Sequence, residues 1–178
     1  MKVIDTNIPD VKIIEPTIFG DERGFFLETF HNQRYQDTLG ITTSFVQDNH
    51  SRSHKNTLRG LHFQKSKPQG KLVRVVSGSV FDVAVDIRPN SLTFGKSTFT
   101  TLSAENKRQQ WIPPGFAHGF LVLSEFADFE YKCTDYYDPH DEGCICWNDP
   151  QLKIEWPTSN PTLSPKDQEG PLLSEIDL

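Results

Sequence analysis

Residues 58–64 place an arginine and a histidine in a largely apolar run, with the sequence Leu-Arg-Gly-Leu-His-Phe-Gln. Around this run, residues 49–81 contain no acidic side chain but seven lysines and arginines, although the whole chain has a net charge of −6. A local excess of positive charge in an acidic protein indicates a site for an anion. The histidine of the run, His62, adds a group that can move a proton near neutral pH.

His62 is the candidate general base. Nearby cations disfavour the protonated imidazole, so we expect His62 to stay neutral and able to accept a proton near pH 7. A purely structural role for a single histidine is the alternative. Arg59 and His62 have opposite parity along a strand, so both face one site only if Gly60 forms a bulge or the strand ends at Arg59.

Three alternating segments each place one polar side chain on the same face as apolar ones. They are Lys71 with Val73 and Val75, His118 with Phe120 and Val122, and Tyr131 with Phe129 and Cys133. A lysine on an apolar face is costly unless it is paired or functional, so Lys71 is a candidate functional group. The opposite orientation, with Leu72 toward the core, fits that segment equally well. For His118 and Tyr131 the alternative is a hydrogen-bonded position in the core.

A metal site is the rival interpretation of the histidines. Gln64 stands where a second ligand beside His62 would be expected, and residues 49–81 supply no carboxylate. Cys144 and Cys146 are possible ligands, but the sequence places no further ligand beside them, so we expect buried, reduced thiols. The residues therefore favour acid–base chemistry without a metal.

Alternation with a period of two predicts that strands position these groups. In residues 80–87 the pattern is that of a half-buried strand, with Asp82 and Asp86 on the face opposite Val83 and Val85. Many short strands separated by Pro and Gly breakers are typical of an all-β sandwich or barrel, and we expect a jelly roll with a few short helices. The expected elements are strands at 71–76, 80–87, 116–122 and 129–133, a hairpin turn at 77–79, a helix at 32–39, and a further helical turn between 164 and 178.

Bulk properties exclude several classes of protein. A chain of 178 residues suits one domain, 1–178. Its polar tail, 159–178, begins within the breaker-rich segment 158–161. A pI near 5.5 argues against nucleic acid as a partner. The sequence begins with no apolar segment of signal length and has no run of about eighteen apolar residues, so we expect no membrane partner and a cytoplasmic location. An odd number of cysteines, three, suits a reducing compartment.

Ordered motifs occur at residues 21–28, 47–51, 58–64, 69–74, 81–88, 111–120, 131–132 and 147–150. They resemble those of the dTDP-4-dehydrorhamnose 3,5-epimerases of deoxysugar biosynthesis, which have a cupin-type jelly roll. The resemblance covers nearly the whole chain. Two departures are Ser97, where many relatives carry tryptophan, and a loop between His62 and Lys71 that is one residue shorter than in some.

The resemblance implies a role for each candidate residue. His62 would remove the proton α to the 4-keto group and be oriented by Asp167. Tyr131 would protonate the opposite face of the enolate, and Lys71, assisted by His118, would stabilise its charge. The implied substrate-binding residues are Arg23, Arg59 and Lys166 at the diphosphate, Gln47 and Asn49 at the sugar, Phe19 and Tyr137 at the thymine ring, and Glu28 and Glu142 in the nucleotide pocket.

The resemblance also implies a dTDP-sugar substrate and a homodimer in which a neighbouring subunit's N-terminal segment completes the site. No redox cofactor is implied, because the ketone itself accepts the electron pair. Since all the implied catalytic residues are present, we expect epimerisation at both C3 and C5. The alternatives are an enzyme that acts at C3 or C5 alone, a related enzyme for another nucleotide sugar, and a non-catalytic sugar-nucleotide binding protein.

Overall fold

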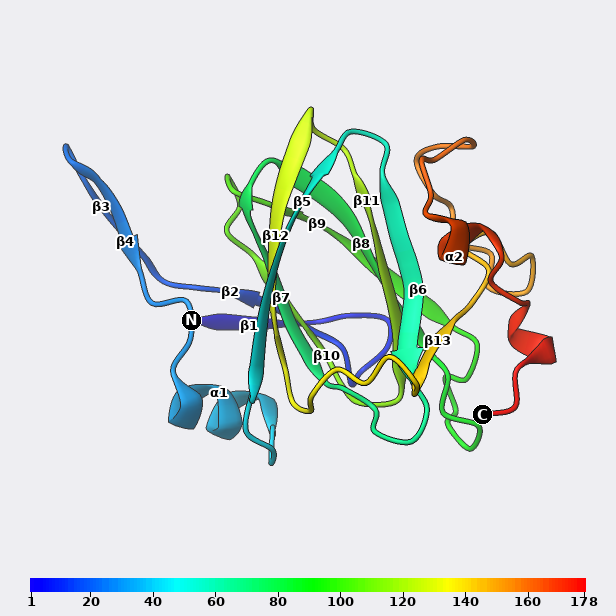
Figure 1. The fold of residues 1–178 in the computed structure, drawn as a ribbon. Helices are drawn as coiled ribbons and strands as arrows, with labels where there is room; N and C mark the ends of the chain where they lie inside the picture. The colour runs from blue at the N-terminus through cyan, green and yellow to red at the C-terminus, as the bar shows by residue number, and fades with distance from the viewer.

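Two antiparallel β-sheets face each other and form a jelly-roll barrel, as the sequence predicts (Figure 1). The computed structural model describes residues 1–178. In spatial order the first sheet consists of β1 (Lys2–Asp5), β2 (Lys12–Glu15), β10 (Gln109–Ile112), β7 (Lys71–Ser77), β12 (Phe126–Cys133) and β5 (Gln47–His54). The second sheet consists of β13 (Glu142–Cys144), β6 (Leu58–Gln64), β11 (Phe116–Val122), β8 (Ser79–Asp86) and β9 (Ser97–Ser103).

A separate hairpin, called the arm below, projects away from the barrel (Figure 1). It is made of β3 (Ile18–Asp21) and β4 (Gly24–Leu27), which pair only with each other. Its aromatic side chains are exposed: Phe19 at 61%, Phe25 at 63% and Phe26 at 69%. Exposed aromatic side chains gathered on one small hairpin are unusual for a surface that stays in water.

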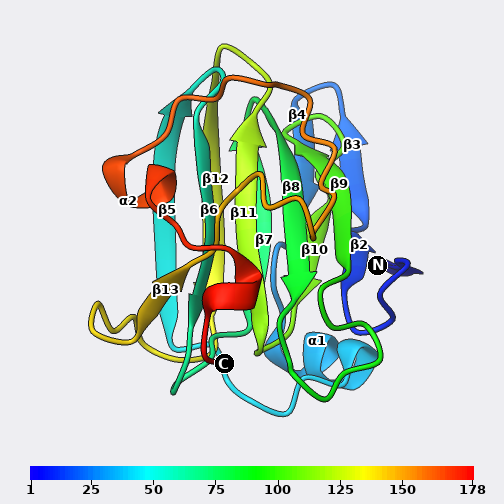
Figure 2. The ribbon, with the colours of Figure 1, turned by 90° about the vertical axis from the view of Figure 1, so that its right-hand side faces the viewer.

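Helices are few and short, as expected. The helix α1 (Asn32–Leu39) has the predicted bounds; it begins where the His31 ring accepts a hydrogen bond from the Arg34 amide and ends at Gly40, which has a left-handed φ of 67°. Near the C-terminus lie α2 (Pro165–Gln168) and the short 3-10 helix η1 (Leu173–Glu175), where a helical turn is predicted. Figure 2 shows this C-terminal segment crossing the outer face of the second sheet. The structure contains no helix long and apolar enough to cross a membrane.

The main hydrophobic core fills the space between the two sheets. Val73 and Val75 enter it from the first sheet together with Phe129, and Phe120 and Val122 enter it from the second. These are the faces predicted to point inward beside Lys71, Tyr131 and His118. Leu72 lies on the opposite face of β7 and packs outside the barrel with Tyr35 of α1. The orientation of Lys71 that the sequence left open is therefore the inward one.

Two predictions about β7 and β8 are wrong. The turn at Gly78 is not a hairpin turn, because β7 pairs with β10 and β12 whereas β8 pairs with β9 and β11 in the other sheet. Nor is β8 half-buried, since the C-terminal segment covers one face and the barrel interior the other. Asp82 and Asp86 are consequently both fully buried. Alternation reveals the two faces of a strand but not what later covers them.

Candidate active site

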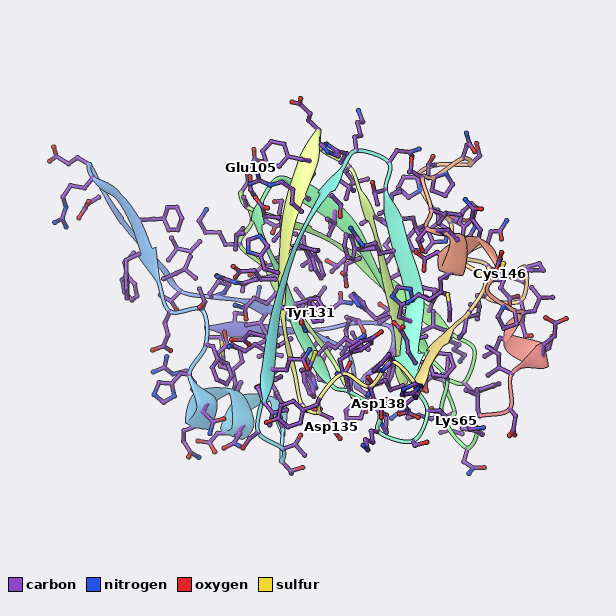
Figure 3. All side chains as sticks on the ribbon, in the orientation of Figure 1. Lys65, Glu105, Tyr131, Asp135, Asp138 and Cys146 are labelled. Carbon is purple, nitrogen blue, oxygen red and sulfur yellow. The ribbon has the colours of Figure 1, made fainter.

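A cavity of about 350 Å³ opens between the two sheets at one end of the core. Its size suits a small ligand or part of a larger one. Figure 3 shows Tyr131 in the interior between the sheets. The lining residues are Gln47, Asn49, Ser51, Arg59, His62, Gln69, Lys71, His118, Phe120, Phe129, Tyr131, Tyr137 and Glu142.

The first sheet presents its polar groups in cross-strand rows. Asn49 of β5 pairs with Tyr131 of β12, and in the next row Gln47 pairs with Cys133, which pairs with Lys71 of β7. Directly paired residues of antiparallel strands lie on the same face of a sheet. The register therefore brings the predicted acid, the predicted enolate-stabilising cation and the two predicted sugar ligands onto one wall of the cavity.

The second sheet presents the two histidines side by side. His62 of β6 pairs with His118 of β11. The strands then lose register: between the pairs His118–His62 and Phe120–Arg59, one residue of β11 lies opposite two residues of β6. The extra residue in β6 is a bulge at Gly60, whose φ is 124°. This bulge confirms one of the two expected solutions to the parity problem, because both Arg59 and His62 line the cavity.

His62 and Asp167 form a hydrogen-bonded pair although 105 residues separate them. The distance between Nε2 of His62 and Oδ1 of Asp167 is 2.5 Å. Ser164 donates to the other carboxylate oxygen at 2.7 Å. Burial pushes the pKa of Asp167 upward, but these hydrogen bonds hold it below its ordinary value. Because an ionised carboxylate only accepts, the proton of a neutral His62 lies on Nε2 and leaves the lone pair of Nδ1 free to act as a base.

His118 has an analogous partner inside the barrel. Its Nε2 lies 2.9 Å from Oδ2 of Asp82, a fully buried carboxylate. Gln110 donates to the other Asp82 oxygen at 3.1 Å. The sequence left open whether His118 is a hydrogen-bonded core side chain or a functional group. The structure shows a hydrogen-bonded core side chain that also lines the cavity.

Burial shifts the pKa values of both Tyr131 and Lys71. Burial raises the pKa of Tyr131 to about 12, so the phenol stays protonated at neutral pH. Burial lowers the pKa of Lys71, whereas the charges of Cys133, Glu142 and Asp82 act in the opposite direction. No hydrogen bond or ion pair within the chain engages the Lys71 ammonium group. A half-buried cation without a partner is suited to an anion that arrives with the ligand.

Charged and aromatic groups line the mouth of the cavity. Glu142 accepts from Lys166 at 2.8 Å and from the Tyr137 hydroxyl at 2.9 Å. Burial pushes the pKa of Glu142 upward, but these two hydrogen bonds keep it below its ordinary value. Arg59 donates to the Ser53 hydroxyl at 3.0 Å and has no carboxylate partner. The mouth therefore combines an aromatic ring with cations suited to a phosphate group.

Three predicted residues lie away from this cavity. Phe19 and Arg23 belong to the arm, where Arg23 forms an ion pair with Asp21 at 2.5 Å. Glu28 follows the arm and forms an ion pair with Arg34 of α1. The other eleven predicted residues line the cavity or bond directly to residues that do.

The structure adds groups that sequence reasoning missed. Gln69 and Ser51 line the cavity, and Asp82, Gln110 and Ser164 support the two histidine–carboxylate pairs. The sequence could have indicated the role of Asp82, because an aspartate within a strand of Val and Ala is costly unless it is hydrogen-bonded. Cys144 and Cys146 are half-buried rather than buried, and Cys144 lies beside Asp167. The carboxylate that residues 49–81 do not supply thus comes from the C-terminal segment.

Comparison with known proteins agrees with this geometry. The model of the dTDP-4-dehydrorhamnose 3,5-epimerase family matches residues 5–175. The chain belongs to that family. It is therefore an epimerase, an enzyme of the isomerase class, and the resemblance noted in the sequence is confirmed. A dTDP-4-dehydrorhamnose 3,5-epimerase from Salmonella typhimurium is 60% identical over 177 residues, which covers 98% of this chain and 97% of that protein.

Solved structures of family members have the same fold. A dTDP-6-deoxy-D-glucose-3,5-epimerase from Legionella pneumophila, in complex with dTDP-4-keto-L-rhamnose, superposes with a TM-score of 0.97 at 60% identity and covers 99% of this chain and 94% of that chain. A 3'-monoepimerase from Streptomyces bikiniensis, in complex with dTDP-quinovose, has a TM-score of 0.89 at 32% identity and covers 96% of this chain and 87% of that chain. The fold is therefore shared by double and single epimerases and does not by itself indicate how many carbons are inverted.

Proposed function

We propose that this epimerase inverts both C3 and C5 of dTDP-4-dehydro-6-deoxy-D-glucose and yields dTDP-4-dehydro-L-rhamnose, in dTDP-L-rhamnose or related deoxysugar biosynthesis. One observation supports this most strongly. His62 on the second sheet, hydrogen-bonded to Asp167 of α2, and a protonated tyrosine on the first sheet line the same cavity. A base and an acid on opposite walls are what inversion of a carbon requires, because the proton leaves from one face and returns to the other.

The proposed base is Nδ1 of His62. A hydrogen beside a ketone is acidic because the enolate places its charge on the carbonyl oxygen. His62 takes this proton and becomes an imidazolium, which the Asp167 carboxylate stabilises through Nε2. The same base serves C3 and C5, since both carbons adjoin the single C4 ketone.

Lys71, assisted by His118, stabilises the enolate oxygen. Lys71 approaches from the first sheet and His118 from the second, so the C4 oxygen lies between them. Preorganised positive charge aimed at a developing oxyanion is usually the largest single contribution to catalysis of this kind. Lys71 has no partner within the chain, which suits this role because the enolate provides the negative charge.

Tyr131 delivers the new proton. Its raised pKa keeps the phenol protonated between turnovers, and its place on the wall opposite His62 directs the proton to the other face of the planar enolate. The His62 imidazolium then gives its proton to solvent and the Tyr131 phenolate takes one from solvent, which restores the starting state. The electron pair moves only between carbon and the ketone oxygen, so the proposed reaction uses no redox cofactor and no metal.

The nucleotide occupies the mouth of the cavity in this proposal. Arg59 and Lys166 bind the diphosphate, Tyr137 stacks on the thymine ring beside Glu142, and Gln47 and Asn49 hold the sugar. The location that we propose for the enzyme is the cytoplasm. Its three cysteines are unpaired, which suits a reducing compartment.

A homodimer completes the site in this proposal. Phe19, Arg23 and Glu28 lie in or beside an arm that projects from its own barrel. An exposed aromatic hairpin that carries an arginine suits the mouth of a second copy's cavity, where it would add a stacking ring and a phosphate ligand.

Solvent isotope exchange tests the proposed function. The enzyme is incubated with dTDP-4-dehydro-6-deoxy-D-glucose in D₂O, and the sugar is analysed by NMR and mass spectrometry. Deuterium at both C3 and C5, together with the L-rhamno product, is the expected result. Deuterium at one carbon alone would show a monofunctional epimerase, and no deuterium would leave sugar-nucleotide binding as the function.

A further inference from the structure

Three potential metal ligands converge behind the cavity wall. Cys144 of β13 is the direct cross-strand partner of His62, so the two side chains leave the sheet on the same face. Cys144 Sγ lies 3.8 Å from Oδ1 of Asp167, the same oxygen that Nε2 of His62 approaches. The nitrogen, the sulfur and the oxygen all lie within 4.8 Å of one another.

We propose that His62, Cys144 and Asp167 form an inhibitory binding site for a zinc-like divalent cation. Zn²⁺ is bound in proteins by imidazole nitrogen, thiolate sulfur and carboxylate oxygen, most often in a tetrahedron. Bonds of about 2.0–2.3 Å place the ligand atoms of such a tetrahedron about 3.3–3.8 Å apart. The sulfur–oxygen distance of 3.8 Å already meets this spacing. To reach it, the 2.5 Å contact between His62 and Asp167 must open by about 1 Å, and the nitrogen and the sulfur, which lie within 4.8 Å of each other, must close by up to about 1 Å. Water supplies the fourth ligand.

The charges of the bound ligands match those of a dication. Burial, together with the neighbouring Asp167 charge, raises the pKa of the Cys144 thiol to about 12. The metal displaces this proton to solvent and binds the thiolate, with no change of oxidation state. Lys166 is the nearby cation that opposes binding, but its charge is paired with Glu142 at 2.8 Å. A thiolate and a carboxylate then balance the two positive charges of the ion.

Metal binding removes the proposed base by changing the tautomer of His62. The cation takes the Nε2 lone pair, which forces the ring proton onto Nδ1. An Nδ1–H group cannot accept a proton from the sugar. This consequence depends on the proposed function, whereas occupation of the site does not.

Cobalt spectroscopy tests the site without turnover. Co²⁺ is titrated into the metal-free protein, and we expect tetrahedral d–d bands and a thiolate-to-cobalt charge-transfer band, both displaced by Zn²⁺. Cys144→Ser should lose the charge-transfer band and weaken Co²⁺ binding by at least about tenfold. Cys146→Ser is the matched control, because Cys146 Sγ contacts Asn148 instead, and it should retain the band. Absence of the band in the wild type, or its persistence in Cys144→Ser, would overturn the proposal.

Isotope exchange then tests the inhibition. Zn²⁺ should suppress C–H exchange of the wild-type enzyme by at least about tenfold and EDTA should restore it, while Cys144→Ser exchanges normally in the same Zn²⁺. Equal inhibition of both proteins would reject the role of Cys144. A charge-transfer band in a protein that exchanges nothing even without metal would refute the epimerase proposal but not the metal site.

Discussion

His62 and His118 each present one ring nitrogen to a buried carboxylate, at 2.5 Å for Asp167 and 2.9 Å for Asp82. A carboxylate partner fixes the orientation of the ring and determines which nitrogen faces the substrate. Lys71 differs from both, because no group of its own chain neutralises it. At the scale of single residues, the cavity therefore contains a lysine whose charge no group of its own chain neutralises.

The first prediction concerns the positive charge of Lys71. Lys71→Met keeps the length of the side chain but removes the cation, and should lower kcat by about 10²–10³-fold, since one donor to the oxyanion is lost. Binding of dTDP, measured by calorimetry, should change little because the nucleotide lies at the mouth. Lys65→Met is the control: Lys65 is exposed and its ammonium group contacts only Asp177, so loss of that charge should leave kcat unchanged. Equal kcat values for the two variants would remove Lys71 from the mechanism.

The bulge at Gly60 is the element that brings Arg59 and His62 to one cavity. A Cβ at Gly60 would lie 2.5 Å from the Cα of Gly119 and 2.6 Å from the carbonyl oxygen of His118. Only glycine therefore lets β6 approach β11 this closely while holding its φ of 124°.

Gly60→Ala should force the two strands apart. We expect a loss of about 3 kcal/mol or more in the free energy of unfolding, together with loss of activity, because His62 and His118 both move. Gly40→Ala is the matched control. Gly40 also has a positive φ but meets no atom within 4 Å of an added Cβ, so it should cost about 1–2 kcal/mol and spare kcat. Urea unfolding and kcat are the measurements, and equal effects of the two substitutions would contradict this account of the bulge.

At the scale of strands and helices, the sequence predicted where the strands lie better than which strands pair with one another. Alternation located the strands that contain Lys71, His118 and Tyr131, because a two-residue period depends only on local geometry. It could not show that β7 and β8 enter different sheets, since turn residues such as Gly78 fit a hairpin and a crossover equally well. Nor could it orient Lys71, because Leu72 on the other face is also buried, against α1.

The molecule as a whole joins groups that are distant in the chain. Asp167 reaches His62 only because residues 159–178 pack along the second sheet, where the Thr162 amide donates to Asn56 and Leu58 donates to Thr162. Composition marked this segment only as a polar tail. Its role came from the resemblance to a family, since no local pattern links two residues 105 positions apart.

Mixed dimers test the proposed exchange of arms. The His62→Ala chain and an arm variant with Phe19→Ala and Arg23→Ala are expressed together with different tags, and the mixed dimer is isolated. If the arm serves the partner's cavity, one site of each mixed dimer is fully native, so about half of the wild-type activity should return. If each arm serves its own barrel, or if no dimer forms, the mixture should be no more active than the separate variants.

The stability of the protein at low pH tests the contribution of Asp86, the buried carboxylate at the end of β8. Asp86 accepts hydrogen bonds from Arg88, Ser91 and Thr93, which outweigh burial and hold its pKa far below the ordinary value. Such a group contributes stability above the pKa of the unfolded chain, about 3.9, and this contribution is lost as pH falls toward the folded pKa.

Asp86→Asn should therefore lower the free energy of unfolding by about 3 kcal/mol at pH 7, and the difference from wild type should shrink between pH 5 and pH 2. Asp177→Asn, at an exposed position, should match wild type throughout. Denaturant titrations at each pH make the comparison. A difference that stays constant down to pH 2 would show that the charge of Asp86 does not stabilise the fold.

In the proposed reaction, a base on β6 and an acid on β12 act on opposite faces of the sugar. The most direct measurement compares exchange and inversion for Tyr131→Phe in D₂O. Without the acid, His62 should still remove the proton and return deuterium to the same face, so label enters C3 and C5 of the unchanged substrate while inversion falls by about 10²-fold or more. His62→Ala should abolish both. Inversion by Tyr131→Phe at the wild-type rate would contradict the account.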